Sequence, residues 1–213
     1  MVDDRIIERS ELCATGGSDR LLPWVQQVLR EGGTGLPQLD AIACGAGPGS
    51  FTGIRLACGI AQGLAYGADL PVVSIGTLEA LAFAQGPGRI LVCMDARMNE
   101  VYHATYDVAG DEVDAISEPQ VCPPELLPLP AGKGWKACGD GFASYAETLT
   151  RRLGNTINHV DAIFPPLAAW VARLAARQVH IGNTLLAAQA MPLYVRDKVA
   201  LTTPERMARG GSK

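Results

Sequence analysis

Several features that mark common protein classes are scarce or missing in this sequence. Aromatic residues make up 6% of the 213 residues, and the three histidines, His103, His159 and His180, stand far apart. No two cysteines have the Cys-x-x-Cys spacing that is typical of zinc sites. Basic residues number 18 against 22 acidic ones, so the formal net charge is −4. Because nucleic-acid affinity depends largely on Lys and Arg that neutralise phosphates, we do not expect the chain to hold RNA or DNA by itself.

Long apolar runs are also missing. Charged residues, Gly or Pro interrupt every apolar stretch before it reaches the ~20 residues that span a bilayer. The first five residues, Met-Val-Asp-Asp-Arg, contain no apolar signal core. We therefore expect a cytoplasmic protein without membrane contact.

The six cysteines are scattered, most of them inside apolar runs. We expect reduced, buried thiols of an intracellular protein, with a zinc site or a disulfide framework as the alternative. The cysteines concerned are Cys13, Cys44, Cys58, Cys93, Cys122 and Cys138.

What the sequence does contain is typical of a compact globular protein. Hydrophobic residues make up 48% and charged residues 19%, and the 24 glycines follow no regular period. This composition excludes a disordered chain and a collagen-like repeat. The length is sufficient for one substantial domain or two small packed lobes.

Helical and strand-like apolar patterns alternate along the chain. The predicted helices cover residues 18–30, 51–65, 77–84 (capped by Thr77) and 142–153, with one more opening at 165–166. The predicted strands cover residues 6–13, 39–44, 71–75, 90–94, 100–107 and 136–139, with a final extended piece at 192–196. The alternation predicts an α/β fold, and an antiparallel hairpin with its tight turn at residues 95–99 makes the sheet mixed.

Local signals add detail to these elements. Ser18 is the expected N-cap of the first helix, and Pro23 is expected in its first turn, so that the helix begins near residues 19–22. Prolines accumulate between residues 108 and 134 and predict a loop that crosses between lobes or over the surface. The tail from residue 203 onward is expected to be disordered.

A glycine-rich turn joins the second predicted strand to the helix over residues 51–65. Backbone N–H groups converge at such a turn and can hold an anion, and nearby hydroxyl and guanidinium groups add donors. The candidate residues for a phosphate or nucleotide cradle are Gly47, Gly49, Ser50, Thr52 and Arg55. The turn is neither Gly-x-Gly-x-x-Gly nor a P-loop, so a tight turn whose glycines serve backbone geometry alone is the alternative.

The helix after this turn carries three regularly spaced glycines. Gly59, Gly63 and Gly67 stand four residues apart, which leaves a strip of bare backbone along one side of the helix. Each interior glycine costs about 1 kcal/mol of helix stability relative to alanine, and close approach of another segment would offset that cost. Two interpretations remain open: close packing inside the chain's own core, or a helix–helix interface with another subunit.

The charged residues around the 95–99 turn are the remaining candidates for chemistry. Asp95 and Glu100 could form a general acid–base pair, but three charges in one tight turn, with Arg97 between them, also pair with one another or with the backbone. No Ser-His-Asp or Cys-His arrangement can be read from the spacing. We therefore assign no catalytic residue, no metal ligand and no cofactor.

Five stretches carry a family resemblance. They are Leu21–Pro23 (LLP), Gly47–Arg55 (GPGSFTGIR), Gly59–Ala65 (GIAQGLA), Asp95–Tyr102 (DARMNEVY) and Pro192–Asp197 (PLYVRD). In these residues the chain resembles the TsaB (YeaZ) family of bacterial tRNA threonylcarbamoyladenosine (t6A) biosynthesis proteins. The stretches occur in the family's order and extend over nearly the whole chain.

The resemblance implies a fold and a role. The fold is the two-lobed one of actin, Hsp70 and sugar kinases (ASKHA). The role is that of a non-catalytic scaffold for the related TsaD protein, which transfers threonylcarbamoyl to adenosine 37 of tRNAs that read codons beginning with A. An ATPase, TsaE, joins the assembly, and a TsaC-type enzyme supplies the threonylcarbamoyl adenylate. The chain would meet tRNA only through this complex, and it is expected to self-associate when the partner is absent.

The resemblance also implies an interface. In this family the first amphipathic helix and the helix after the glycine-rich turn form a bundle with TsaD or with a second copy. The residues that fall on these faces are Leu21, Leu22, Val25, Leu56, Gly59, Ile60, Gly63, Leu64 and Gly67.

The same resemblance predicts the lobe boundaries and shows two differences between this chain and the family. We expect an N-terminal, partner-binding lobe at residues 1–108, a C-terminal lobe at 109–202 and a disordered tail at 203–213. Relatives open with a strand, an Asp-Thr turn and a second strand, so the first lobe is expected to lack N-terminal strand structure here. Relatives also often have His where Gly17 stands, which puts any role of that imidazole in doubt.

A second functional hypothesis belongs to a different class. It is an ATP-binding enzyme of the sugar-kinase type, or a glycoprotease-like peptidase. Nucleotide would then bind at residues 47–52.

Overall fold

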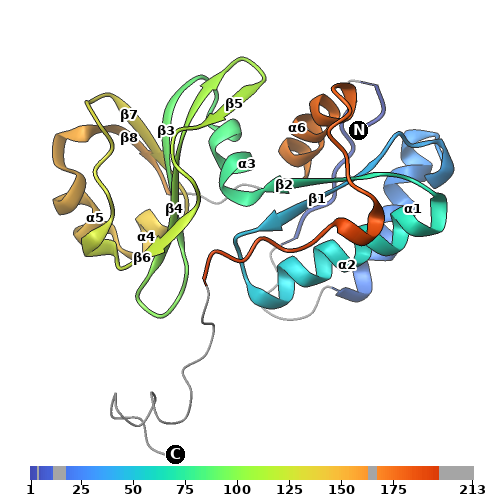
Figure 1. Ribbon diagram of the computed structural model, residues 1–213, viewed down its shortest axis with the longest axis horizontal. Coiled ribbons are helices and arrows are strands. Elements are labelled where there is room, and N and C mark those ends of the chain that lie inside the picture. The colour runs from blue at the N-terminus through green and yellow to red at the C-terminus, as the bar shows by residue number, and fades with distance from the viewer. Residues whose placement is uncertain (4, 12–17, 163–166, 197–213) are drawn as a thin grey trace, which may run out of the picture.

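The computed structural model describes residues 1–3, 5–11, 18–162 and 167–196, which form two lobes (Figure 1). The first lobe holds α1 (Ser18–Gly32), β1 (Ile42–Gly47), α2 (Phe51–Ala68), β2 (Val72–Gly76) and α6 (Ala168–His180). The second holds β3 (Gly88–Asp95), β4 (Val101–Ala109), β5 (Glu112–Ala115), β6 (Gln120–Cys122), β7 (Trp135–Cys138), α4 (Gly141–Ser144), α5 (Ala146–Leu153) and β8 (Ile157–Asp161). Helix α3 (Thr77–Ala84) lies between the lobes.

The sheet of the second lobe is mixed, as the sequence predicts. Its strand order is β5-β4-β3-β7-β8, and β6 pairs with β4. Strands β3 and β4 are antiparallel, whereas β3–β7 and β7–β8 are parallel. The turn between β3 and β4 is tight because Arg97, Met98 and Asn99 all have φ near +60°.

The first lobe is built on a smaller sheet. Strands β1 and β2 run parallel, and among the described residues this sheet has no further strand. Figure 1 shows the two strands between α2 and α6. Small residues let α2 approach β1 closely: Cys58, Ala61 and Ala65 pack with Cys44 and Val72 in one buried cluster.

A larger core joins the two lobes. Ile75 of β2, Leu81 of α3, Val92 of β3 and Leu174 of α6 belong to one cluster of buried residues. The two sheets do not divide the chain at residue 108, where the sequence predicts the lobe boundary. Strands β3 and β4, which precede that residue, share a sheet with β5–β8, and α6, which follows it, packs near β1 and β2. The sequence-based lobe boundaries stay a prediction.

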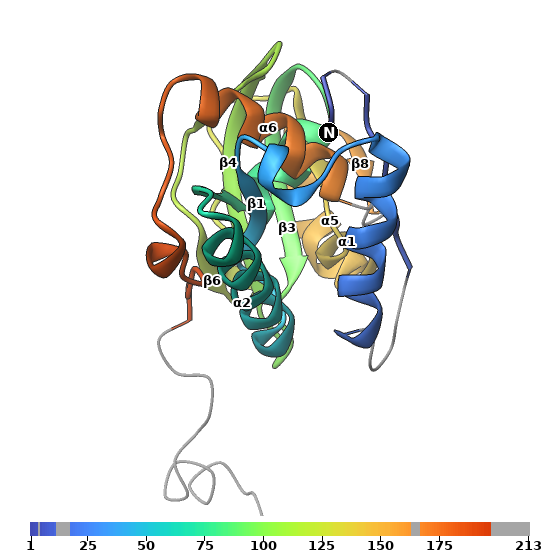
Figure 2. The same ribbon diagram turned by 90° about the vertical axis from the view of Figure 1, so that its right-hand side faces the viewer.

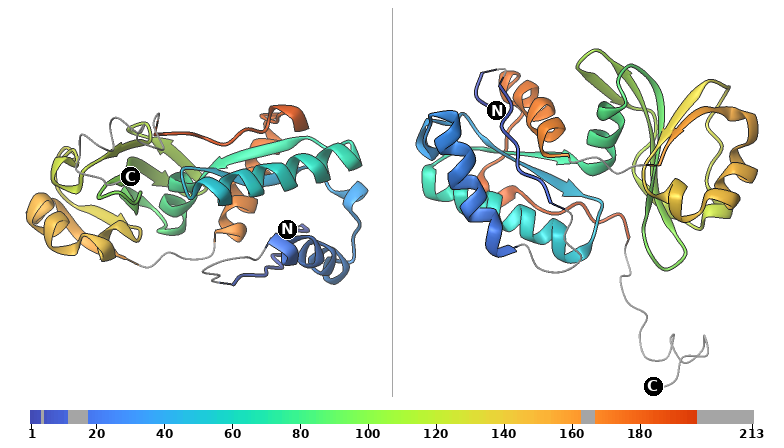
Figure 3. Two further views of the ribbon diagram at one scale, coloured as in Figure 1. Left: turned by 90° about the horizontal axis from the view of Figure 1, so that it is seen from below. Right: turned by 180° about the vertical axis from the view of Figure 1, so that it is seen from behind.

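Helix α1 is attached differently from the other long helices. None of its residues is buried, and Leu22 on its apolar face is 51% exposed. Figures 2 and 3 show α1 at the side of the first lobe, with the N-terminal segment between it and α6.

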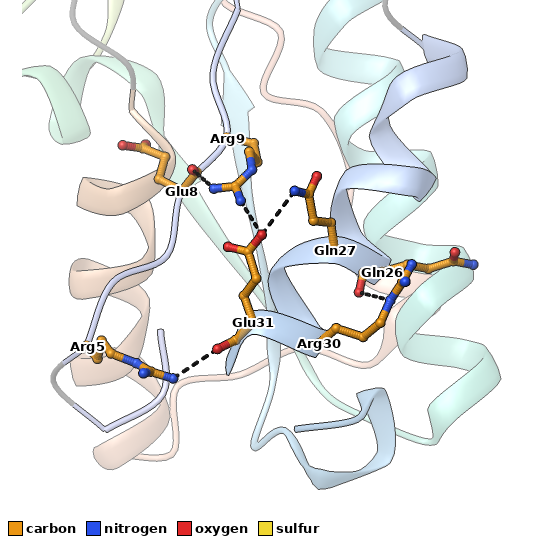
Figure 4. A network of polar contacts seen from close by, with 7 residues as sticks. All are labelled: Arg5, Glu8, Arg9, Gln26, Gln27, Arg30 and Glu31. Atoms are coloured by element: carbon orange, nitrogen blue, oxygen red, sulfur yellow. Dashed lines mark hydrogen bonds and ion pairs between the residues drawn. The ribbon is translucent and has the colours of Figure 1, made fainter. Parts of the chain in front are cut away.

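Polar contacts hold α1 to that segment (Figure 4). Glu31 accepts hydrogen bonds from Arg9 and from Gln27, and Arg5 donates to the Glu31 carbonyl. These bonds hold the pKa of the Glu31 carboxyl below its usual value, with Arg9 as the main cause. On the other side of the segment, Glu8 accepts a hydrogen bond from the N–H of Ala169, at the start of α6.

Most predicted elements are confirmed, but several boundaries were wrong at the N-terminal side. Residues 6–11 are not a strand, although Val2 and Arg5 form a β-bridge just before them, and residues 12 and 13 of the predicted strand lie outside the described residues. Helix α1 begins at Ser18 itself, so Pro23 is in its second turn. Strand β1 begins and ends three residues later than predicted. Its pairing with β2 starts at Ile42 and continues through Gly45 to Gly47. Gly76, not Thr77, is the N-cap of α3.

The second lobe contains further differences. The stretch predicted as a loop between residues 108 and 134 contains β5 and β6, both paired with β4. The helix predicted over 142–153 is broken at Tyr145, whose hydroxyl bonds to Asp95. Strand β8 was not predicted. The predicted opening of the last helix at 165–166 and the tail from residue 203 lie outside the described residues.

The structure also bears on the cysteines and on membrane-spanning helices. Cys44, Cys58, Cys93 and Cys138 are buried free thiols, as predicted, whereas Cys122 is only partly buried. In the part of the chain that the structure describes, no helix is both long and apolar enough to cross a membrane.

Candidate partner-binding face and interlobe cleft

The turn from β1 to α2 uses its glycines and Ser50 for backbone geometry. Gly47 has φ +118°, and a β-carbon there would lie 3.0 Å from the carbonyl oxygen of Leu193. A β-carbon on Gly49 would lie 3.2 Å from Cγ2 of Ile54. The Ser50 hydroxyl caps α2 by accepting a 3.2 Å hydrogen bond from the N–H of Gly53. The tight-turn interpretation thus explains these residues, and anion binding by the cradle remains a prediction.

A cleft opens beside this turn. Its volume is about 640 Å³, and three segments line it: the turn into α2 (residues 48–51), the β3–β4 turn and residues 193–196. Residues 193–196 lie beside the end of β1, because the N–H of Leu193 donates a 2.8 Å hydrogen bond to the Ala46 carbonyl. The cleft therefore lies between the two lobes.

The charged residues of the cleft bind one another and the backbone. Asp95 accepts hydrogen bonds from the N–H of Arg97 (2.8 Å) and from the Tyr145 hydroxyl (3.2 Å), and it pairs with the Arg97 guanidinium (3.1 Å). Asp140 accepts a 2.9 Å bond from the N–H of Asp95. The structure does not bring Glu100 to Asp95 as an acid–base pair, since Glu100 forms an ion pair with Arg196 instead.

The exposed side of α2 carries the glycine strip. Gly59, Gly63 and Gly67 are exposed, and among the described residues no atom outside the helix lies within 4 Å of a β-carbon built on any of them. The opposite side, with Ile54 and Cys58, is buried. In the described part of the chain the strip thus packs against nothing, which disagrees with close packing inside the chain's own core.

The other predicted interface residues flank this strip or lie on α1. Leu56, Ile60 and Leu64 of α2 are partly buried, as are Leu21 and Val25 of α1. The structure places the two groups on separate helices of the first lobe (Figure 2).

Two functional candidates were missed by sequence reasoning. Tyr194 and Arg196 line the cleft, and each contacts a residue of another segment: Tyr194 contacts Arg55, and Arg196 contacts Glu100. Their stretch, PLYVR, was part of the family resemblance, but nothing in its composition indicated a contact with α2 or with the β3–β4 turn.

The two-lobed α/β architecture, the cleft between the lobes and the capped helix after the glycine-rich turn define a protein of the ASKHA type. Comparison with known families agrees: the family model described as "TsaD: tRNA N6-adenosine threonylcarbamoyltransferase" matches residues 10–201.

Individual relatives narrow the family. The Escherichia coli K12 protein named tRNA threonylcarbamoyladenosine biosynthesis protein TsaB is 35% identical over 208 residues, which cover 93% of this chain and 88% of that protein. The Haemophilus influenzae protein of the same name is 36% identical over 207 residues, covering 89% and 84%. A crystal structure from Pseudomonas aeruginosa, of an uncharacterized protein with similarity to peptidase YeaZ, superposes with a TM-score of 0.76 at 37% identity and covers 84% of this chain and 83% of that one. The chain belongs to the TsaB (YeaZ) family.

Proposed function

We propose that this protein takes part in the formation of N6-threonylcarbamoyladenosine at position 37 of tRNAs that read codons beginning with A. Its role is that of a non-catalytic scaffold for a TsaD-type transferase, in an assembly that a TsaE-type ATPase joins. Membership of the TsaB family supports the pathway. The observation that carries the scaffold role is the exposed, unoccupied glycine strip of α2.

The strip is suited to a partner helix. Without side chains at Gly59, Gly63 and Gly67, another helix can approach the backbone of α2 closely and gain dispersion contacts along its length. The three glycines together cost on the order of 3 kcal/mol of helix stability relative to alanine. Nothing in the described chain offsets that cost, whereas a docked partner would. We assign Leu56, Ile60 and Leu64 to the edge of this docking face, and Leu21, Leu22 and Val25 of α1 to its extension.

The cleft supports a non-catalytic role. Asp95 and Glu100 are both engaged in ion pairs, and Asp140 accepts a backbone N–H, so these carboxylates serve the structure of the turn. With a net charge of −4 the chain would leave tRNA contact to its partners. In this role the protein would work in the cytoplasm, and its first lobe would provide the docking face.

A direct test of the docking face replaces one glycine by a large side chain. Gly63→Leu would project a leucine from the strip into the partner and is expected to abolish binding of the TsaD-type protein in a calorimetric titration. Thr150→Leu is the matched control, because it places the same side chain on an exposed position of α5, in the other lobe. Circular dichroism checks that both variants fold. Unchanged affinity of Gly63→Leu would remove the docking face.

A reconstituted reaction tests the function itself. Unmodified tRNA, threonine, bicarbonate and ATP are combined with the TsaC-, TsaD- and TsaE-type proteins, with and without this chain. Formation of threonylcarbamoyladenosine only in its presence is the expected result. Equal product in both reactions, or no product in either, would contradict the scaffold role.

The cleft beside the N-terminus of α2 favours one alternative, an ATP-binding enzyme of the sugar-kinase type. The alternative predicts that Mg-ATP stabilises the protein in a thermal-shift scan and that Arg55→Ala weakens this effect. No stabilisation at millimolar nucleotide would contradict it.

A further inference from the structure

Arg55 is held in place by two aromatic residues from different parts of the chain. Its guanidinium carbon lies 3.3 Å from the ring centroid of Phe51 and 5.4 Å from that of Tyr194. Its Nε donates a 2.7 Å hydrogen bond to the Tyr194 hydroxyl, across 139 residues of sequence. The side chain is therefore ordered although residue 55 is exposed.

The charge of Arg55 has no carboxylate partner among the described residues. The ion pairs of the described chain involve Arg9, Arg20, Arg97, Arg151, Arg177 and Arg196, but not Arg55. Residue 55 lies in the second turn of α2, which begins at Phe51. The aromatic contacts thus hold a cation for which the described residues supply no ion-pair partner.

Arg55 lies in the same row as the glycine strip. Residues 51, 55, 59, 63 and 67 are all exposed, and each four-residue step turns about 40° around the helix. A helix docked along the glycines therefore passes Arg55 at the end of the row that is nearest to the cleft.

We infer that Arg55 is the charged anchor of this docking face, and that the partner helix runs antiparallel to α2 with an Asp or Glu in its last turn opposite Arg55. This inference rests on the proposed function. An antiparallel helix brings its negative, C-terminal end beside the N-terminal half of α2, whereas a parallel helix would bring a second positive end to Arg55. A carboxylate at that end matches the planar, two-pronged donor geometry of the guanidinium.

Tyr194 is a positioning residue in this arrangement. Its hydroxyl and ring orient the guanidinium before the partner arrives, so that less side-chain entropy is lost on binding. This role gives the PLYVR stretch a function that its sequence alone did not indicate. The stretch lies beside β1, so its contact with Arg55 depends on the tertiary fold.

The test measures affinity for the TsaD-type protein by calorimetry at about 50 and about 500 mM NaCl. Salt screens exposed charges more strongly than a buried ion pair, so the change in affinity between the two concentrations reports on the charges at the interface. Arg55→Gln is expected to weaken binding about tenfold or more at low salt and to reduce the salt dependence of the affinity. Arg55→Lys keeps the charge and is expected to retain the salt dependence with part of the affinity. Tyr194→Phe removes the hydroxyl and is expected to weaken binding while the salt dependence persists. Arg151→Gln, at a 70% exposed arginine of α5, is the matched control.

The outcomes separate this inference from the proposed function. If Gly63→Leu abolishes binding while Arg55→Gln binds like the parent protein, the docking face stands and the anchor is overturned. If neither variant changes the affinity, the docking face itself fails. If Arg55→Gln changes only self-association, measured by sedimentation, the occupant is a second copy and the inferred partner carboxylate is overturned.

Discussion

Cys93 and His103 lie directly opposite each other on the antiparallel strands β3 and β4, and both are buried in the second lobe. The Nε2 atom of His103 has no hydrogen-bond partner among the described residues. Burial lowers the pKa of His103 and raises that of Cys93. Burial thus favours the neutral form of both side chains, and a charge on either of them would be costly here.

Stability is expected to depend on pH through His103. Because its pKa is lower in the folded state than in the unfolded chain, about 6.5, the unfolded state binds the proton more readily. The contribution of His103 to the free energy of unfolding is thus complete above about pH 6.5 and decreases as the pH falls below that value. Urea unfolding at pH 7.5, 6.5 and 5.5 measures this decrease. The variant His103→Gln should show a flatter pH profile, and an identical profile would contradict the assignment.

Gly63→Ala is expected to raise the stability of the isolated protein. A β-carbon at this position meets nothing within 4 Å, so the substitution adds helix propensity without a clash. The gain should be about 0.5–1 kcal/mol in the free energy of unfolding, measured by urea denaturation. A loss of stability would show that another part of the chain covers the strip.

Gly139→Ala is expected to be strongly destabilising. Its φ is +108°, and a β-carbon would lie 2.4 Å from the carbonyl oxygen of Cys93. The clash and the strained backbone together should cost more than about 2 kcal/mol. Gly110→Ala is the control, because Gly110 has φ +62° and open space around it, so it should cost only about 1 kcal/mol. Equal losses for the two variants would refute the close contact with Cys93.

Ser50→Ala tests the role of the glycine-rich turn. Loss of the hydroxyl leaves the N–H of Gly53 without its cap and should destabilise the protein by about 0.5–2 kcal/mol. Ser50→Asp keeps an acceptor at the N-cap and should retain most of the stability. Thermal unfolding compares the three proteins. If the alanine and aspartate variants were equally stable, the hydroxyl would have no capping role.

Local sequence patterns predicted the helices well and the short strands poorly. Helix α2 was predicted because its apolar residues repeat at helical spacing after a strong turn signal. Strands β5, β6 and β8 are three to five residues long and contain no buried residue, so they carry little local signal. They are strands because β4 and β7 offer them hydrogen-bonding edges, which is a non-local property.

The sequence by itself determined the family, the α/β class and the positions of the glycines on α2, because each depends on residue types at fixed spacings. Only the tertiary structure decided whether those glycines face the core or the solvent, because a helix buries whichever side its neighbours cover. Likewise, only the fold brings Tyr194 to Arg55, since 139 residues separate them and backbone bonding to β1 positions the later segment.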